Sequence, residues 1–161
     1  MTELSTRRTD TDLTVLCLPL EDPRVQPLVD GLTEEYDSRY GTTFGGAAEE
    51  MRRYPSTDFV APHGTLLILQ ENGQTVAGGA FRRYDEQTAE LKRIWTHADH
   101  RRRGLARQVL LELEDEAARY GYRRIYLTTG PRQPEAKTGR PLCRPLGWRT
   151  ASAGSRRLRQ C

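Results

Sequence analysis

The sequence predicts a single α+β domain built on a mixed β-sheet with flanking helices. Three segments rich in apolar and β-branched residues follow one another with short turns between them, which predicts an antiparallel meander over 64–97. The apolar period then changes to about 3.6 residues, which predicts a helix over 104–120. A further strand is expected at 124–129, and a strand, helix and strand in succession favour a right-handed crossover with parallel strands.

Within the meander, strands are expected at 64–70, 75–84 and 88–97, and Asn72-Gly73 suits the positive φ of a tight hairpin turn. A strand over 12–18 and a helix over 22–40 are expected before it, the helix because apolar residues recur at spacings of three and four. A short helix is expected over 45–54 and is stopped at Pro55.

Length and composition fit one globular domain. The chain has 161 residues, of which 36% are hydrophobic and 29% charged. Its longest apolar runs, such as Thr65–Leu69, are far shorter than the roughly 20 residues that cross a bilayer. The N-terminus lacks the layout of a secretion signal, so we expect a cytoplasmic protein with no membrane partner. We divide the chain into a flexible lead-in (1–11), one domain (12–148) and a basic tail (149–161).

Positive charge gathers at the C-terminal end. Residues 132–161 hold eight Lys and Arg and one acidic residue, a net charge of +7. Since the whole chain has a net charge of +3, residues 1–131 have a net charge of −4. Such asymmetry indicates either an anionic partner or an unusual tail. No nucleic-acid-binding motif accompanies the charge, which disfavours a nucleic-acid partner.

The cysteines and histidines predict neither a disulfide framework nor a metal site. Cys17, Cys143 and Cys161 are widely separated and form no C-x-x-C pair. His97 and His100 lie close together, but no third ligand accompanies them.

One segment has the features of an anion site. Arg101-Arg102-Arg103-Gly104-Leu105-Ala106 lies between a predicted strand and a predicted helix. Small residues at 104 and 106 leave the first N–H groups of the helix open, and these donors, the helix dipole and the arginines favour a bound diphosphate. A solvated basic helix start explains the arginines equally well. Neither the Walker pattern nor G-x-G-x-x-G occurs.

The segment Glu90-Leu91-Lys92-Arg93-Ile94-Trp95-Thr96-His97, followed by Arg101-x-x-Gly104-x-Ala106, resembles the fourth strand and pyrophosphate loop of the GNAT superfamily of acetyl-CoA-dependent N-acetyltransferases. The family pattern is [QR]-x-x-G-x-[GA]. Its place after three antiparallel strands and before a helix and a parallel strand makes the match specific. The downstream stretch 128–136 is similar to a sequence common in bacterial members, and the resemblance covers about 12–137.

The resemblance implies a GNAT-like fold whose fourth and fifth strands splay apart, and acetyl-CoA as co-substrate without a metal. The backbone amides of 101–106 are expected to hold the pyrophosphate. Ile94, Trp95 and Thr96 are expected to present backbone groups to the pantetheine arm, with the Ile94 N–H polarising the thioester carbonyl. The cofactor-binding set is Ile94, Trp95, Thr96, Arg101, Arg102, Arg103, Gly104, Leu105, Ala106 and Gln133.

Glu90 is the candidate general base, because an amine must lose a proton before it attacks and a carboxylate can take that proton directly or through water. Its place matches the catalytic glutamate of some family members. The alternative is that Glu90 only pairs with Lys92 or with an arginine on a neighbouring strand. Tyr36, Tyr40 and Arg82 are the candidate acceptor-binding residues, with core packing or surface charge as the alternatives.

The C-terminal end departs from the family pattern. The family continues after 136 as a helix whose tyrosine is the general acid, whereas here Cys143 stands in that place and Gly139, Pro141 and Pro145 oppose a helix. Residues 149–161 lack the alternation of a closing hairpin. The leading interpretation is acetyl transfer to a primary amine of a small molecule or protein in a ternary complex. A CoA-binding module with weak or no catalysis is the alternative, and a homodimer stays open.

Overall fold

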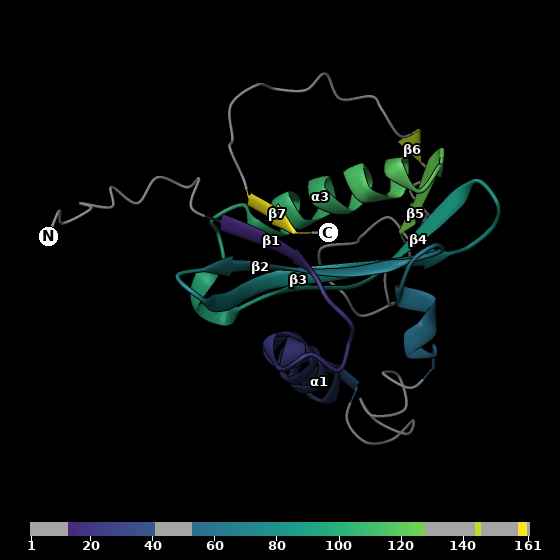
Figure 1. The fold of residues 1–161 in the computed structure, drawn as a ribbon. Helices are drawn as coiled ribbons and strands as arrows, with labels where there is room; N and C mark the ends of the chain where they lie inside the picture. The colour runs from purple at the N-terminus through teal and green to yellow at the C-terminus, as the bar shows by residue number, and fades with distance from the viewer. Residues whose placement is uncertain (1–12, 41–52, 128–143, 146–157, 161) are drawn as a thin grey trace, which may run out of the picture.

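The fold is a seven-stranded mixed sheet in the order β6-β5-β4-β3-β2-β1-β7, with helices on both faces (Figure 1). The structure is a computed structural model that describes residues 13–40, 53–127, 144–145 and 158–160. The strands are β1 (Leu13–Cys17), β2 (Thr65–Glu71), β3 (Gln74–Arg83), β4 (Thr88–Thr96), β5 (Arg124–Leu127), β6 (Arg144–Pro145) and β7 (Leu158–Gln160). The helices are η1 (Pro23–Val25), α1 (Gln26–Tyr40), η2 (Ser56–Phe59), η3 (Ala98–His100) and α3 (Leu105–Arg119).

The mixed α+β architecture predicted from the sequence is confirmed. Strands β2, β3 and β4 form an antiparallel meander, and β4 pairs in parallel with β5 after the crossover through α3. The β2–β3 turn places Asn72 and Gly73 at φ 51° and 75°, as its sequence predicts. Most of the short helix expected over 45–54 lies outside the described residues.

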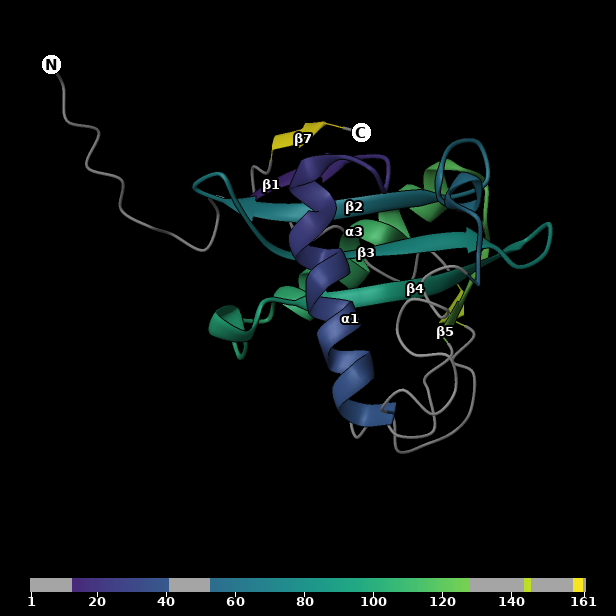
Figure 2. The same ribbon diagram turned by 90° about the horizontal axis from the view of Figure 1, so that it is seen from below.

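Two apolar cores lie on the two faces of the sheet. Figure 2 shows α1 crossing β2, β3 and β4 on the face opposite α3. The core under α3 is built mainly from Val15, Leu67, Leu69, Val76, Phe81, Leu91, Val109 and Leu113. The core under α1 consists of Leu16, Val25, Leu28, Phe59, Leu66, Ile68, Ala80 and Trp95. Because β2 and the middle of β3 are buried on both faces, they read as continuous apolar runs rather than as alternating ones.

A β-bulge interrupts β4. Ala80 of β3 faces Lys92 and Gly78 faces Trp95, so Arg93 and Ile94 together oppose the single residue Gly79. Arg93, the first of the two bulged residues, has a left-handed backbone conformation with φ 58°. The bulge reverses the alternation of side chains, which brings Trp95 into the core under α1 and packs Ile94 against the core under α3.

The chain end returns to the sheet. β7 pairs in parallel with β1, so part of the tail expected to lack a closing strand extends the sheet. Cys17, at the end of β1, is disulfide-bonded, and its partner lies outside the described residues. The expectation of no disulfide is therefore wrong. Spacing along the chain does not predict which distant segments pair as strands, and here β7 pairs with β1.

Helix α1 packs closely against β4 at Gly31. A Cβ atom at this position would lie 2.0 Å from Nε1 and 2.5 Å from Cε2 of Trp95, whose ring is buried. The glycine therefore lets the helix backbone pack directly against the indole beside the bulge.

We predict that Gly31→Ala destabilises the protein by about 1–3 kcal/mol, because overpacking against Trp95 outweighs the helix propensity that alanine adds. Urea unfolding measures the free energy. Ser38→Ala, at an exposed position of the same helix, serves as control and is expected to stay within about 0.5 kcal/mol of wild type. A Gly31→Ala protein as stable as the control would contradict the packing described here.

Candidate active site

The loop after β4 ends in a left-handed turn at Gly104. This residue has φ 72° and ψ 18° and caps α3 without a side-chain hydrogen bond to the first turn. The helical ladder begins with the Gln108 N–H, which donates to the Gly104 carbonyl at 3.1 Å. The N–H groups of Leu105 and Ala106 precede that ladder and have no carbonyl within the helix. A Cβ built on Gly104 meets nothing within 4 Å among the described residues. The turn therefore offers backbone donors and open space for an anion.

Two of the three loop arginines bind carboxylates of neighbouring elements. Arg101 Nη2 donates to Glu35 Oε1 of α1 at 2.8 Å. Arg103 Nη2 donates to Glu71 Oε2 of β2 at 2.5 Å, and its Nη1 lies 2.7 Å from His100 Nδ1. These contacts fix the loop against both α1 and β2. They also direct the two guanidiniums at protein carboxylates, so the backbone amides are the principal donors of the turn.

Strand β4 continues past the described part of its parallel partner β5, whose last described residue is Leu127. The β4–β5 ladder joins Thr88–Leu91 to Arg124–Leu127, whereas β4 continues along β3 as far as Thr96, within the part of the chain that the structure describes. The residues past the ladder include Ile94, Trp95 and Thr96, the expected pantetheine contacts. Residues 128–143 lie outside the described part of the chain, so the splaying expected between the fourth and fifth strands stays a prediction.

Glu90 is buried on the α1 side of the sheet, and only 7% of its side chain is exposed. Its Oε2 accepts from Arg82 Nη1 at 3.1 Å, and its Oε1 accepts from Lys92 Nζ at 3.0 Å. Arg82 is the residue directly across the β3–β4 ladder. The pairings named as the alternative to a catalytic role are thus present, and whether Glu90 also acts as a base stays a prediction.

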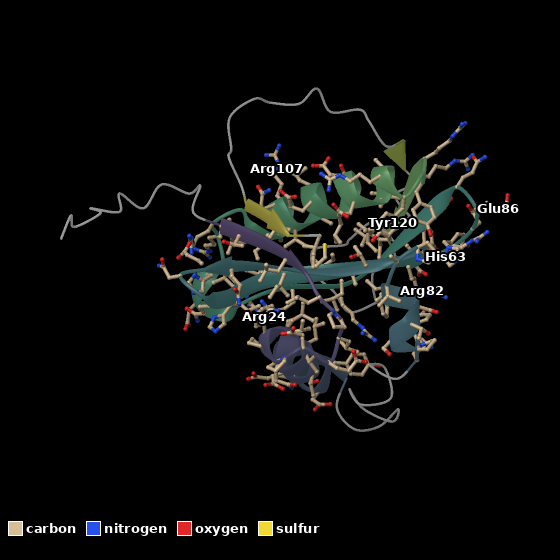
Figure 3. All side chains as sticks on the ribbon, viewed as in Figure 1. Arg24, His63, Arg82, Glu86, Arg107 and Tyr120 are labelled. Carbon is tan, nitrogen blue, oxygen red and sulfur yellow. The ribbon has the colours of Figure 1, made fainter. Side chains whose placement is uncertain are left out.

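Arg82 connects Glu90 to η2. Its Nε donates to Asp58 Oδ2 at 3.0 Å, and its guanidinium lies 4.4 Å from the centroid of the Tyr54 ring. Figure 3 shows Arg82 beside η2, on the sheet face opposite Arg107 and Tyr120 of the α3 layer. Burial disfavours the charged guanidinium, but the hydrogen bonds that it donates to Asp58 and Glu90 outweigh this effect and raise the pKa of Arg82. The guanidinium is therefore a permanent cation that donates hydrogen bonds to the carboxylates of Asp58 and Glu90.

The other expected site residues are only partly placed. Tyr36 is half-buried on α1, and Tyr40 is the last residue of that helix. Arg102 is exposed and has φ 63°. Gln133 and Cys143 lie outside the described residues.

The sequence analysis missed Tyr54 and Asp58, which complete the surroundings of Arg82 and Glu90. Both belong to the connection between α1 and β2, where no periodicity marks a function. An aromatic residue and an acid around Pro55 are the only signal, and it is a weak one.

Among residues 13–40 and 53–127, no group of three or more His, Cys, Asp or Glu is placed to hold a metal ion. No helix of the same described part has both the length and the apolar character that a bilayer requires.

The mixed sheet and the turn at Gly104 agree with the resemblance found in the sequence, and a family comparison gives the same result. The profile of the acetyltransferase (GNAT) family matches residues 29–142. The chain belongs to this family.

The individual relatives match this chain over only part of their length or at low sequence identity. The chain is 42% identical over 69 residues to the uncharacterized N-acetyltransferase YsnE of Bacillus subtilis, a match that covers 43% of this chain and 46% of that protein. The chain thus aligns with about half the length of that curated relative. A putative acyl-CoA N-acyltransferase from Klebsiella pneumoniae has a TM-score of 0.58 at 21% identity, covering 78% of this chain and 77% of that one. A GNAT acetyltransferase from Elizabethkingia anophelis with acetyl-CoA bound has a TM-score of 0.55 at 18% identity, covering 74% and 67%. The two structures share the fold.

Proposed function

We propose that the protein transfers the acetyl group of acetyl-CoA to a primary amine, within a ternary complex and without a covalent enzyme intermediate. The observation that carries this proposal is the left-handed turn at Gly104, which lies between β4 and α3 and leaves the first N–H groups of the helix open. Membership of the acetyltransferase (GNAT) family supports it.

The residues present fit the diphosphate of acetyl-CoA. The N–H groups of Leu105 and Ala106 point out of the start of a helix of 15 residues, whose dipole favours negative charge. Gly104 leaves the space above them open. Arg101 and Arg103, held by Glu35 and Glu71, fix the shape of the loop before a ligand arrives. A preformed loop loses little conformational freedom on binding.

When bound, acetyl-CoA supplies the acetyl group as an activated thioester. The chain contributes the backbone of β4 beyond Leu91, and we assign the Ile94 N–H to the thioester oxygen. A fixed N–H donor of this kind stabilises the charge that develops on a carbonyl oxygen during attack. The bulge and the packing of Trp95 against Gly31 hold that part of the strand in place.

Glu90 is the proposed general base. It lies three residues before the bulge, and it is held by Arg82 through one carboxylate oxygen. Its other oxygen, Oε1, accepts from the Lys92 ammonium at 3.0 Å, and we assign to this oxygen the removal of a proton from the acceptor amine, directly or through water.

The phosphate turn is tested with Gly104→Glu, which would place a carboxylate where the diphosphate binds. We predict that acetyl-CoA affinity, measured by calorimetry, falls by about 100-fold or more. Gly121→Glu is the matched control, because Gly121 follows the opposite end of α3, also has positive φ (91°) and also faces open space. This control also places a side chain at a positive φ, and it is expected to bind acetyl-CoA like wild type. Equal affinity of both variants would contradict the assignment of the turn.

The base is tested with Glu90→Gln. We predict that kcat for amine-dependent CoA release falls by about 100-fold or more, while the affinity for acetyl-CoA stays within twofold, because only proton removal is lost. Glu86→Gln is the control. Glu86 is exposed at the tip of the β3–β4 hairpin, away from Arg82 (Figure 3). A kcat that is unchanged in Glu90→Gln would remove Glu90 from the mechanism. Acetyl-CoA binding without turnover of any amine would favour a CoA-binding module.

A further inference from the structure

One of the two cations bound to Glu90, Lys92, is of a residue type that is rare in this chain. Of the 25 Lys and Arg residues only Lys92 and Lys137 are lysines. Lys92 Nζ lies 3.0 Å from Glu90 Oε1 and 5.1 Å from the centroid of the Tyr54 ring, with 20% of the side chain exposed. A primary ammonium therefore occupies a half-buried position between a carboxylate and an aromatic ring.

That position is built independently of Lys92. Arg82 holds the other oxygen of Glu90 and is itself held by Asp58, and the same guanidinium packs on Tyr54. The carboxylate and the ring thus keep their places through Arg82. Together they offer an alkylammonium one charged hydrogen bond and one cation–π contact, the two interactions that recognise such a group in proteins.

We propose that Lys92 is the internal occupant of the acceptor's amine site. The acceptor displaces it from Glu90 Oε1 and from Tyr54, and Lys92 thereby sets the affinity for the acceptor. Lysine suits this task because its ammonium is a single point charge on a flexible four-carbon stem, whereas an arginine would hold the carboxylate through a rigid fork. The inference rests on the proposed function, in which Glu90 lies at the reacting amine.

The occupant also indicates the acceptor's class. The site accommodates the unbranched end of a lysine side chain, a CH₂ group bearing NH₃⁺. The matching acceptors are primary amines on an unbranched carbon, and amines branched at that carbon fit less well. This selection applies to a small alkylamine and to a lysine side chain of a protein alike.

Steady-state kinetics with n-butylamine test the displacement. Removing the occupant with Lys92→Met is expected to lower KM for n-butylamine by about tenfold with acetyl-CoA affinity unchanged, and Lys92→Arg is expected to raise KM. Arg83→Met, the loss of an exposed cation on β3, is the control and is expected to leave KM unchanged. A KM that stays constant or rises in Lys92→Met overturns the proposal. A wild-type enzyme that uses sec-butylamine as efficiently as n-butylamine overturns the assignment of the acceptor class.

A binding measurement needs neither turnover nor a substitution of Lys92. Reductive methylation with ¹³C-formaldehyde labels the two lysines and the N-terminus, so the NMR spectrum of the methyl groups contains few signals. Titrating in n-butylamine is expected to shift the Lys92 signal in wild type and to leave it unchanged in Glu90→Gln. A Lys92 signal that does not move at saturating n-butylamine overturns the proposal. A shift without any acetyl transfer would retain the amine site while rejecting the proposed function.

Discussion

The bulge in β4 is the constraint on which the site depends. Up to Lys92, alternate side chains of the strand face α1, which brings Glu90 next to Arg82. The extra residue at Arg93 and Ile94 then reverses the alternation, so that Trp95 closes the core under α1 and Ile94 packs toward α3. One strand therefore carries a charged cluster before the bulge and an apolar anchor after it. It then leads through η3 to the turn at Gly104.

Paired charges are the second organising feature. Arg101, Arg103 and Arg82 each bond to at least one carboxylate of another element. Such pairs contribute little to stability when exposed. Here they join the loop to α1 and β2, and β3 to β4. At the loop they leave recognition of an anion mainly to backbone N–H groups. At Glu90 they join Oε2 to the rigid guanidinium of Arg82 and Oε1 to the flexible ammonium of Lys92, and the acceptor-site inference uses this difference between the two cations.

The sequence predicted well those features that repeat along the chain. The meander, the apolar stripe of α3 and the glycine signals at Gly73, Gly104 and Gly121 are local patterns with a fixed physical meaning, and each occurs in the structure. Glu90 could be singled out only through a family resemblance. The contacts of Asp58 and Tyr54 could not be foreseen, because they join the α1–β2 connection to β3 and β4 across many residues.

The C-terminal part shows the same limit. Its glycines, prolines and irregular charge predicted no strand, yet β7 pairs with β1 and Cys17 is disulfide-bonded. Strand pairing of a short segment is decided by the edge available to it, and that edge is a property of the folded sheet. The cytoplasmic location expected from the sequence stays a prediction. The disulfide of Cys17 does not favour it, because disulfides persist chiefly in oxidising compartments.

The most direct test of the central claim is an NMR titration of the ¹⁵N-labelled protein with acetyl-CoA, followed through the backbone amide signals. If the turn and the end of β4 bind the cofactor, the largest shifts will belong to Leu105 and Ala106 and to Ile94. Shifts confined to the basic residues 149–161, with the amides of the turn unmoved, would contradict it.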